Sequence, residues 1–277
     1  MASSETSSLK SFCIVTGASR GIGRAIAIAL SSKFSAESHI VLTGRSVDAL
    51  NETQRMVQAA APGVQCKVVI ADHSDEGNIS STLSEITKDV SPDEFQRFLL
   101  IHNAASMWDV SRYAGQSTTS DLRSLQDFCM LNITSALLLT SHYLKTFPQR
   151  NGASRTIVNI SSLAALVPFP GCSVYCMGKA ARHMLFRTIA LEEPDVRVLN
   201  YDPGAVDTAM FRDNATNNAS VDVRQMLERL ENDQQLLKPD QTAAMLLSIL
   251  EKDAFESGAH LSYSDDLAKT VDDFDKK

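Results

Sequence analysis

The chain has 277 residues, of which 44% are hydrophobic and 21% are charged, and it carries a formal net charge of −7. This composition is typical of a globular protein and excludes intrinsic disorder for most of the chain, and no apolar run reaches the roughly 18 residues needed to cross a bilayer. The acidic balance and the lack of any Lys/Arg run argue against nucleic acid or a membrane surface as a partner.

Short apolar runs alternate with longer stretches of helical periodicity along the chain. Runs that are apolar almost throughout are typical of strands buried on both faces of a parallel sheet. Strands are expected at 11–16, 39–43, 67–70, 98–101, 156–160, 196–201 and, more weakly, 259–263. Helices are expected at 22–32, 47–60, 78–90, 125–147, 173–192 and 241–252. The alternation predicts an α/β fold, a doubly wound parallel sheet of Rossmann type with helices on both faces.

One domain accounts for residues 1–277, because no linker, repeat or break in composition divides them. The polar, amide-rich segment 211–239 interrupts the pattern before the last helix, and we expect a mobile insertion there on the substrate side. The tail 264–277 contains five aspartates and is expected to be flexible.

A glycine-rich loop separates the first expected strand from the first expected helix. Glycines let the backbone turn tightly and approach a pyrophosphate, which the free N–H groups at the start of a helix bind. The spacing in this strand–turn–helix context indicates a dinucleotide site, and a purely structural turn is the alternative. The loop residues expected to bind the dinucleotide are Gly17, Ser19, Arg20, Gly21, Ile22 and Gly23.

Arginines stand where an NAD site commonly carries an acidic residue. The second strand ends at 43–46, and this stretch contains Arg45 but neither Asp nor Glu. Arg45 and Arg20 suit a ribose 2′-phosphate, because guanidinium groups form charge-assisted, bidentate bonds with phosphate. The pattern therefore favours NADP(H) over NAD(H), and two solvated surface arginines are the alternative.

Two further loops follow the third and fourth strands, at the edge where a nucleotide would lie. Asp72 and His73 follow the third strand, and Asn103 stands among small residues after the fourth. Small residues let the backbone approach a nucleotide closely. We expect Asp72, His73 and Asn103 to contact the cofactor, with ordinary loop structure as the alternative.

Three residues near the fifth strand suggest carbonyl chemistry. Ser162 follows that strand, and Tyr175 and Lys179 stand four residues apart on one face of the helix 173–192. A nearby ammonium is expected to lower the tyrosine pKa from about 10. Tyr175 would then be a general acid toward a carbonyl oxygen, Ser162 would stabilise the developing alkoxide, and a nicotinamide would supply hydride. A core tyrosine beside a surface lysine is the alternative.

The glycine motif together with Ser162, Tyr175 and Lys179 resembles the short-chain dehydrogenase/reductase family over essentially the whole chain. The resemblance implies that Lys179 also binds the nicotinamide ribose and that Asn132 completes a proton relay. Stretches such as 175–182 resemble the sepiapterin reductase branch of this family. That branch implies NADPH-dependent reduction of the side-chain ketones of pterins (sepiapterin and 6-pyruvoyl-tetrahydropterin) in tetrahydrobiopterin synthesis, by a homodimer packed through its two long helices.

The same resemblance indicates the remaining site residues. Those expected at the nicotinamide side are Val206, Asp207 and Thr208. Those expected to border the substrate are Ser162, Leu163, Tyr175, Gly204 and Ser262.

Ser262 departs from the branch, which carries an aspartate there that binds the edge of the pterin ring. A neutral hydroxyl cannot supply that charge-assisted, bidentate contact, and Asp265 or Asp266 in the tail are the candidates to replace it. A broader dicarbonyl or ketone reductase is therefore the alternative function. A catalytically silent NADPH-binding or sensor protein is an alternative of a different class.

The five cysteines indicate a reducing compartment. Their number is odd and no Cys-x-x-Cys pair occurs, so neither a disulfide framework nor a metal site is expected. The polar first ten residues lack the apolar stretch of a secretory signal. We therefore expect a cytoplasmic protein that binds no metal.

Overall fold

The computed structural model describes residues 9–263, so the acidic tail, with Asp265 and Asp266, lies outside the described residues. Within them, seven parallel strands form one sheet in the order β3-β2-β1-β4-β5-β6-β7. The strands are β1 (Ser11–Val15), β2 (His39–Gly44), β3 (Gln65–Ile70), β4 (Arg97–His102), β5 (Ser154–Ile160), β6 (Val196–Asp202) and β7 (His260–Ser262). The helices are α1 (Gly21–Ser31), α2 (Val47–Ala60), α3 (Ile79–Thr87), α4 (Leu122–Cys129), α5 (Ser135–Thr146), α6 (Ser173–Glu192), α7 (Ala209–Asn217), α8 (Val221–Asn232) and α9 (Pro239–Lys252). The predicted doubly wound α/β fold is confirmed.

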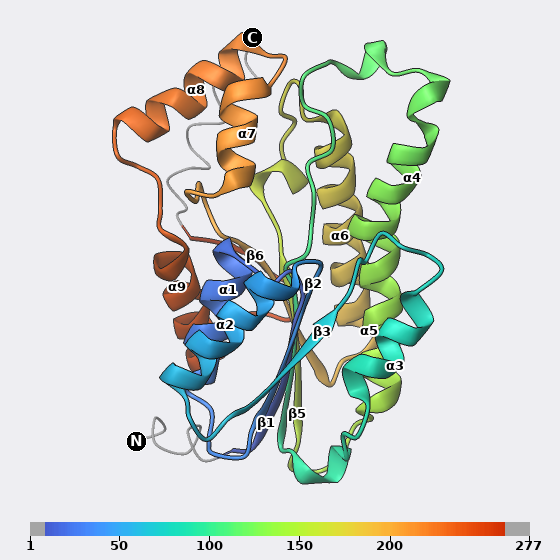
Figure 1. Cartoon of the computed structure of the whole chain (residues 1–277), viewed down its shortest axis with the longest axis vertical. Coiled ribbons are helices and arrows are strands. Elements are labelled where there is room, and N and C mark those ends of the chain that lie inside the picture. Colours follow the sequence, from blue (N-terminus) through green and yellow to red (C-terminus); the bar gives the residue numbers. More distant parts are fainter. Residues whose placement is uncertain (1–8, 264–277) are drawn as a thin grey trace.

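Helices cover both faces of this sheet, and each layer has its own apolar core (Figure 1). On one face α1, α2 and α9 bury residues such as Ile26 and Leu246. On the other face α3, α5 and α6 bury residues such as Leu139 and Phe186. Successive strand residues enter opposite cores, which is why the strand sequences are apolar throughout rather than alternating. Each such side chain contributes about 1.5–3 kcal/mol when it is fully buried.

The strand order reverses at β1, which pairs with both β2 and β4. At such a switch point the loops after two neighbouring strands run in opposite directions and leave a crevice at the carboxyl ends. The loop after β1 is held against β4 there, because the N–H of Thr16 donates to the carbonyl of Ile101 at 3.0 Å. The ligand site is therefore expected at this edge.

The long helix predicted at 125–147 is interrupted. Between α4 and α5, residues Met130–Thr134 form a π-helical turn that contains Asn132. The side-chain amide of Asn132 donates to the carbonyl of Phe128 at 3.0 Å, inside this irregular turn. Such π-turns often occur at functional sites, and periodicity alone could not reveal this one.

Segment 211–239, where the sequence predicts a mobile insertion on the substrate side, forms helices, and its mobility stays a prediction. Most of it lies in α7 and α8, which lie over the carboxyl end of the sheet (Figure 1). The side chains of Thr208 and Ser220 accept hydrogen bonds from the first turns of α7 and α8. No residue of α7 is buried, whereas α8 has a helical apolar spacing at Val223, Met226, Leu227 and Leu230, which the sequence interpretation missed.

Candidate active site

One pocket of about 840 Å³ lies at the carboxyl ends of the strands. Its size is in the range of pockets that bind small ligands and cofactors. The predicted site residues that line it are Gly17, Ser19, Arg20, Gly21, Ile22, Arg45, Asp72, His73, Asn103, Tyr175, Lys179, Asp207 and Thr208. The structure thus brings together residues from α6 and from the loops after five strands, which are far apart in the sequence.

The glycine loop has the geometry that the motif predicts. Gly17 has φ of +65° and Gly21 has φ of +55°, conformations that residues with a Cβ rarely adopt. Gly23 is required for packing instead, because a Cβ there would lie 2.3 Å from the carbonyl oxygen of Gly17. No side chain caps the N-terminus of α1, where Arg20 is the capping residue. The backbone at this helix start therefore fits a pyrophosphate group.

Asn103 holds this loop from the neighbouring strand. Its amide nitrogen donates to the carbonyls of Thr16 and Gly17, each at 3.0 Å. In return the hydroxyl oxygen of Thr16 accepts from the backbone N–H groups of Asn103 and Ala104, each at 3.0 Å. Asn103 lines the pocket, and its side chain fixes the position of the glycine loop.

The two arginines are free to meet a phosphate. Arg20 is exposed, and the Arg45 side chain is 74% exposed with one weak ion pair, 3.9 Å from Asp72. Burial opposes ionisation of Asp72, but hydrogen bonds from Ser74 and the charge of Arg45 outweigh it and lower the pKa of that carboxyl. His73 is buried, with its Nε2 2.8 Å from the hydroxyl of Thr43, and burial lowers its pKa to about 4.

Tyr175 and Lys179 lie on the same face of α6, as their spacing predicts. The Lys179 ammonium lies 5.5 Å from the centroid of the Tyr175 ring. It donates to the carbonyls of Ile160 at 2.7 Å and of Ser161 at 3.2 Å, at the end of β5. The lysine is thus fixed between the tyrosine and the sheet.

The expected lowering of the Tyr175 pKa is wrong for this structure. Burial raises the pKa of the phenol, a hydrogen bond with Ser162 opposes this, and the charge of Asp202 raises it further. Burial, helped by the charge of Arg182, lowers the pKa of Lys179 to about 7. Desolvation is thus the largest influence on the pKa of each group. Tyr175 is therefore a neutral phenol, the form that donates a proton.

Several predicted site residues do not line the pocket. They are Gly23, Asn132, Ser162, Leu163, Gly204, Val206 and Ser262. The hydroxyl oxygen of Ser162 accepts from the N–H of Ala164 at 3.2 Å, at the start of a short 3₁₀ turn. Ser262 donates to Asp202 at 3.4 Å.

Asn132 is buried and is bonded to its surroundings. Its Oδ1 accepts from the N–H of Ser106 at 3.1 Å, and its amide nitrogen donates to the Ser106 hydroxyl and to the Phe128 carbonyl. These bonds connect the π-turn to the loop after β4. None of them reaches Lys179, so the proton relay through Asn132 stays a prediction.

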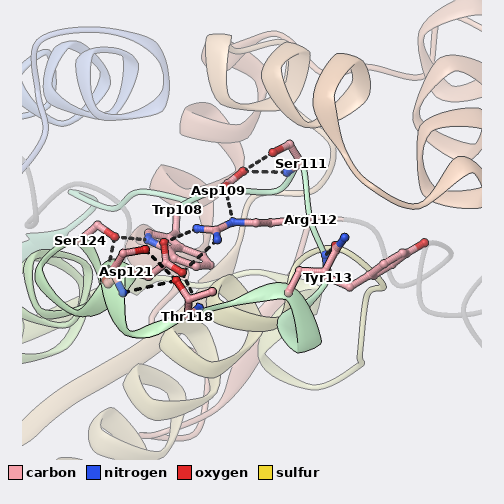
Figure 2. A network of polar contacts seen from close by, with 10 residues as sticks. Trp108, Asp109, Ser111, Arg112, Tyr113, Thr118, Asp121 and Ser124 are labelled. Atoms are coloured by element: carbon pink, nitrogen blue, oxygen red, sulfur yellow. Dashed lines mark hydrogen bonds and ion pairs between the residues drawn. The ribbon is translucent and has the colours of Figure 1, made fainter.

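The sequence interpretation missed the aromatic wall of the pocket, which comes from the loop between β4 and α4. Trp108 lines the pocket with φ of +64°, and its indole N–H donates to Ser124 at 3.1 Å (Figure 2). The Arg112 guanidinium lies 5.1 Å from the indole centroid and bonds to Asp109 and to both carboxylate oxygens of Asp121. A bulky residue at positive φ is strained, and strain of this kind clusters at functional sites.

A buried arginine was also missed as a positioning residue. Arg182 lies one turn after Lys179 on α6 and donates to the side chain of Asn159 and to the carbonyls of His102 and Ala104. These bonds connect α6 to β5 and to the loop after β4. In the sequence, only its position three residues after Lys179 could have indicated the role of this arginine.

The comparisons with known proteins decide the family. The family described as short chain dehydrogenase matches residues 11–219. The chain belongs to this family. Sepiapterin reductase of Rattus norvegicus is 40% identical over 253 residues, which covers 91% of this chain and 96% of that protein. Benzil reductase ((S)-benzoin forming) of Bacillus subtilis (strain 168) is 32% identical, which covers 86% and 93%.

The solved structure of L-sorbose reductase from Gluconobacter frateurii, complexed with NADPH and L-sorbose, has a TM-score of 0.76 at 21% identity, which covers 94% of this chain and 97% of that one. At this identity the likeness concerns the fold alone. This short-chain dehydrogenase is an oxidoreductase, and its family implies a nicotinamide cofactor and a small-molecule substrate. Within residues 9–263 no helix is long and apolar enough to cross a membrane, and no group of three metal-ligating side chains occurs.

Proposed function

We propose that this short-chain dehydrogenase is an NADPH-dependent carbonyl reductase that reduces side-chain ketones of pterins, sepiapterin and 6-pyruvoyl-tetrahydropterin, in tetrahydrobiopterin synthesis. The observation that carries the proposal is the Tyr175–Lys179 pair in a pocket formed by a glycine loop. The 40% identity with a sepiapterin reductase over nearly the full length of both chains supports the substrate class.

A few side chains carry out the steps of the proposed reaction. NADPH supplies the hydride when it is bound. Tyr175, a neutral phenol that lines the pocket, donates the proton to the carbonyl oxygen, and Ser162 hydrogen-bonds the same oxygen as negative charge develops on it. Lys179 orients the tyrosine and binds the ribose, and Asn132 passes protons to it from the loop side.

NADP(H) is favoured by the two exposed arginines. Arg20 and Arg45 flank the start of α1 and the end of β2, where the adenosine ribose of a bound dinucleotide would lie. Their guanidinium groups match a 2′-phosphate. The cofactor residues we propose, beyond these arginines, are Gly17, Ser19, Gly21, Ile22, Gly23, Asp72, His73, Asn103, Tyr175, Lys179, Val206, Asp207 and Thr208. The substrate residues we propose are Ser162, Leu163, Tyr175, Gly204 and Ser262.

A broader dicarbonyl or ketone reductase is the second candidate. The 32% identity with a benzil reductase favours it, since benzil is an aromatic diketone. The neutral hydroxyl of Ser262 also removes a charge from the position where a pterin edge would be bound.

A coenzyme-oxidation assay separates the two candidates. The purified protein is given NADPH with sepiapterin, and in parallel with benzil, and the loss of absorbance at the coenzyme band is followed. A higher kcat/KM for sepiapterin supports pterin reduction. Sepiapterin left unreduced, with rapid turnover of benzil, selects the diketone reductase, and no turnover of either contradicts both.

Surface and cysteine chemistry support our proposals for the assembly and the compartment. We propose one catalytic domain that pairs into a homodimer through α5 and α6, which expose Leu137, Met184 and Leu191 to solvent in the isolated chain. All five cysteines are free, in keeping with a reducing cytoplasm as the compartment.

A further inference from the structure

Asp202 is a buried carboxylate that hydride and proton transfer do not use. It is the last residue of β6 and is 6% exposed. Pro203, which follows it, lines the pocket. A carboxylate is strongly hydrated in water, so burying it is unfavourable unless hydrogen bonds or a cation replace that water.

The bonds to Asp202 are fewer than a buried carboxylate can accept. Its Oδ1 accepts from the N–H of Gly204 at 3.0 Å, and its Oδ2 accepts from the Ser262 hydroxyl at a long 3.4 Å. Within residues 9–263 no lysine, arginine or histidine forms an ion pair with it. An ionised carboxylate has about four lone-pair sites, so about two remain for a further donor.

Asp202 lies close to the reacting groups. The N–H of Ser161 donates to the carbonyl of Tyr201 at 2.7 Å, next to Asp202, and the carbonyl of Ser161 accepts from Lys179 at 3.2 Å. The negative charge of Asp202 raises the pKa of both Tyr175 and Lys179. Because the next residue, Pro203, lines the catalytic pocket, we consider a molecule bound there as the source of a donor to Asp202.

We propose that Asp202, positioned by Ser262 on the paired strand, binds the hydrogen-bond-donating edge of the substrate and selects a planar 2-aminopyrimidinone or amidine group over a simple ketone. Two parallel N–H donors on such an edge match the two oxygens of one carboxylate. The strand register places Asp202 opposite Ser262, so the carboxylate lies one strand away from the position where the sequence led us to expect it. The inference rests on the proposed function, since pterins carry such an edge.

The first test compares two substrates. In Asp202→Asn we expect the ratio of kcat/KM for sepiapterin to kcat/KM for benzil to fall at least about tenfold, mainly through the KM for sepiapterin, because a hydrogen bond to a charged group is lost. Asp253→Asn is the matched control, an exposed carboxylate paired with Arg197, and should leave the ratio as in the wild type. The double variant Asp202→Ala with Ser262→Asp should recover the ratio, which a purely structural role of Asp202 would not allow.

The second test needs no turnover. The binding of 2-amino-4-hydroxypteridine to the NADP⁺-loaded protein is followed by its fluorescence anisotropy, with 4-hydroxypteridine, which lacks the 2-amino donor, as competitor. The wild type should prefer the amino compound at least about tenfold, and Asp202→Asn should lose that preference. Equal preference in both proteins, or none in the wild type, overturns the inference. Since this outcome does not depend on reduction, it stays decisive even if sepiapterin is not reduced and the proposed function fails.

Discussion

The chemistry of the site depends most on the hydroxyl of Tyr175. Its pKa is raised by burial, so the phenol holds its proton until a developing alkoxide takes it. We expect Tyr175→Phe to lower kcat at least about 100-fold, since general acid catalysis typically contributes that much, while NADPH still binds. Steady-state rates and a titration of NADPH fluorescence measure the two effects. Turnover near that of the wild type would remove Tyr175 from its role.

Coenzyme preference is expected to depend on Arg45. This side chain is exposed, and its one ion pair, with Asp72, is long and weak, so its charge is available for a phosphate. Arg45→Asp should reverse the preference toward NADH, because a carboxylate repels a 2′-phosphate and accepts hydrogen bonds from ribose hydroxyls. The ratio of kcat/KM with NADPH to that with NADH is the measurement. An unchanged ratio would contradict the proposed phosphate site.

Burial of Lys179 predicts how stability changes with pH. Its pKa is about 7 in the folded chain, against about 10.5 in an unfolded one, so between these values the unfolded chain binds the extra proton. The free energy of unfolding should therefore rise from pH 7 to 9, by up to about 1.4 kcal/mol per unit, relative to Lys179→Met. Urea titrations of both proteins at pH 7, 8 and 9 test this. If the free energies of unfolding of the two proteins change equally with pH, Lys179 keeps an ordinary pKa in the folded chain.

Residues in local motifs could be predicted from the sequence, and residues that depend on distant partners could not. Gly17 and Gly21 were predicted because a turn at positive φ favours glycine, and Lys179 because four residues separate it from a tyrosine. Trp108 and Asp202 gave no such signal. Their importance comes from Arg112 and Ser262, which only the folded chain brings to them.

At the scale of elements, the sequence predicts a strand or helix well when its apolar residues follow a clear and recognised pattern. Strands such as β1 and β4 are apolar on both faces, so their positions were predicted to within about two residues. The helix α7 buries no residue, and both α7 and α8 begin at hydroxyl caps, Thr208 and Ser220, which loops also contain. The π-turn between α4 and α5 leaves the apolar periodicity almost unchanged and was invisible for that reason.

The loop between β4 and α4 depends on Arg112, which connects Trp108 with Asp109 and Asp121 (Figure 2). Lysine cannot replace this planar, bidentate contact. We expect Arg112→Ala to free the loop, shift the emission of Trp108 to longer wavelength and raise the KM for the carbonyl substrate severalfold. Trp108 is the sole tryptophan of the chain, so its emission reports this loop alone.

Arg123→Ala is the matched control for that experiment. Arg123 is an exposed arginine on α4 that pairs with Asp127 four residues along the same helix, and such pairs contribute little. Its removal should leave the emission of Trp108 where it is in the wild type. If Arg112→Ala behaves like Arg123→Ala, the strained backbone of Trp108 does not need the guanidinium.

At the scale of the whole molecule, one helix serves both the site and the surface. On α6 Tyr175, the proposed general acid, lines the pocket, while Met177, Met184 and Leu191, spaced seven residues apart, are exposed. Seven residues make about two helical turns, so these three lie along one face of α6, and α5 also exposes an apolar side chain, Leu137. An apolar stripe of this kind on a helix pair is typical of a surface that another chain covers.

A charge in the middle of that stripe tests the dimer. Met184 is 57% exposed in the isolated chain, so Met184→Arg should leave the fold intact. If α5 and α6 pack against a second copy, the buried guanidinium has no partner, and the dissociation constant should rise at least about 100-fold. Analytical ultracentrifugation measures it. Met56→Arg, at an exposed methionine of α2 in the opposite helix layer, is the control and should stay dimeric. Equal sedimentation of both variants would assign the interface to another surface, and a monomeric wild type would contradict the homodimer.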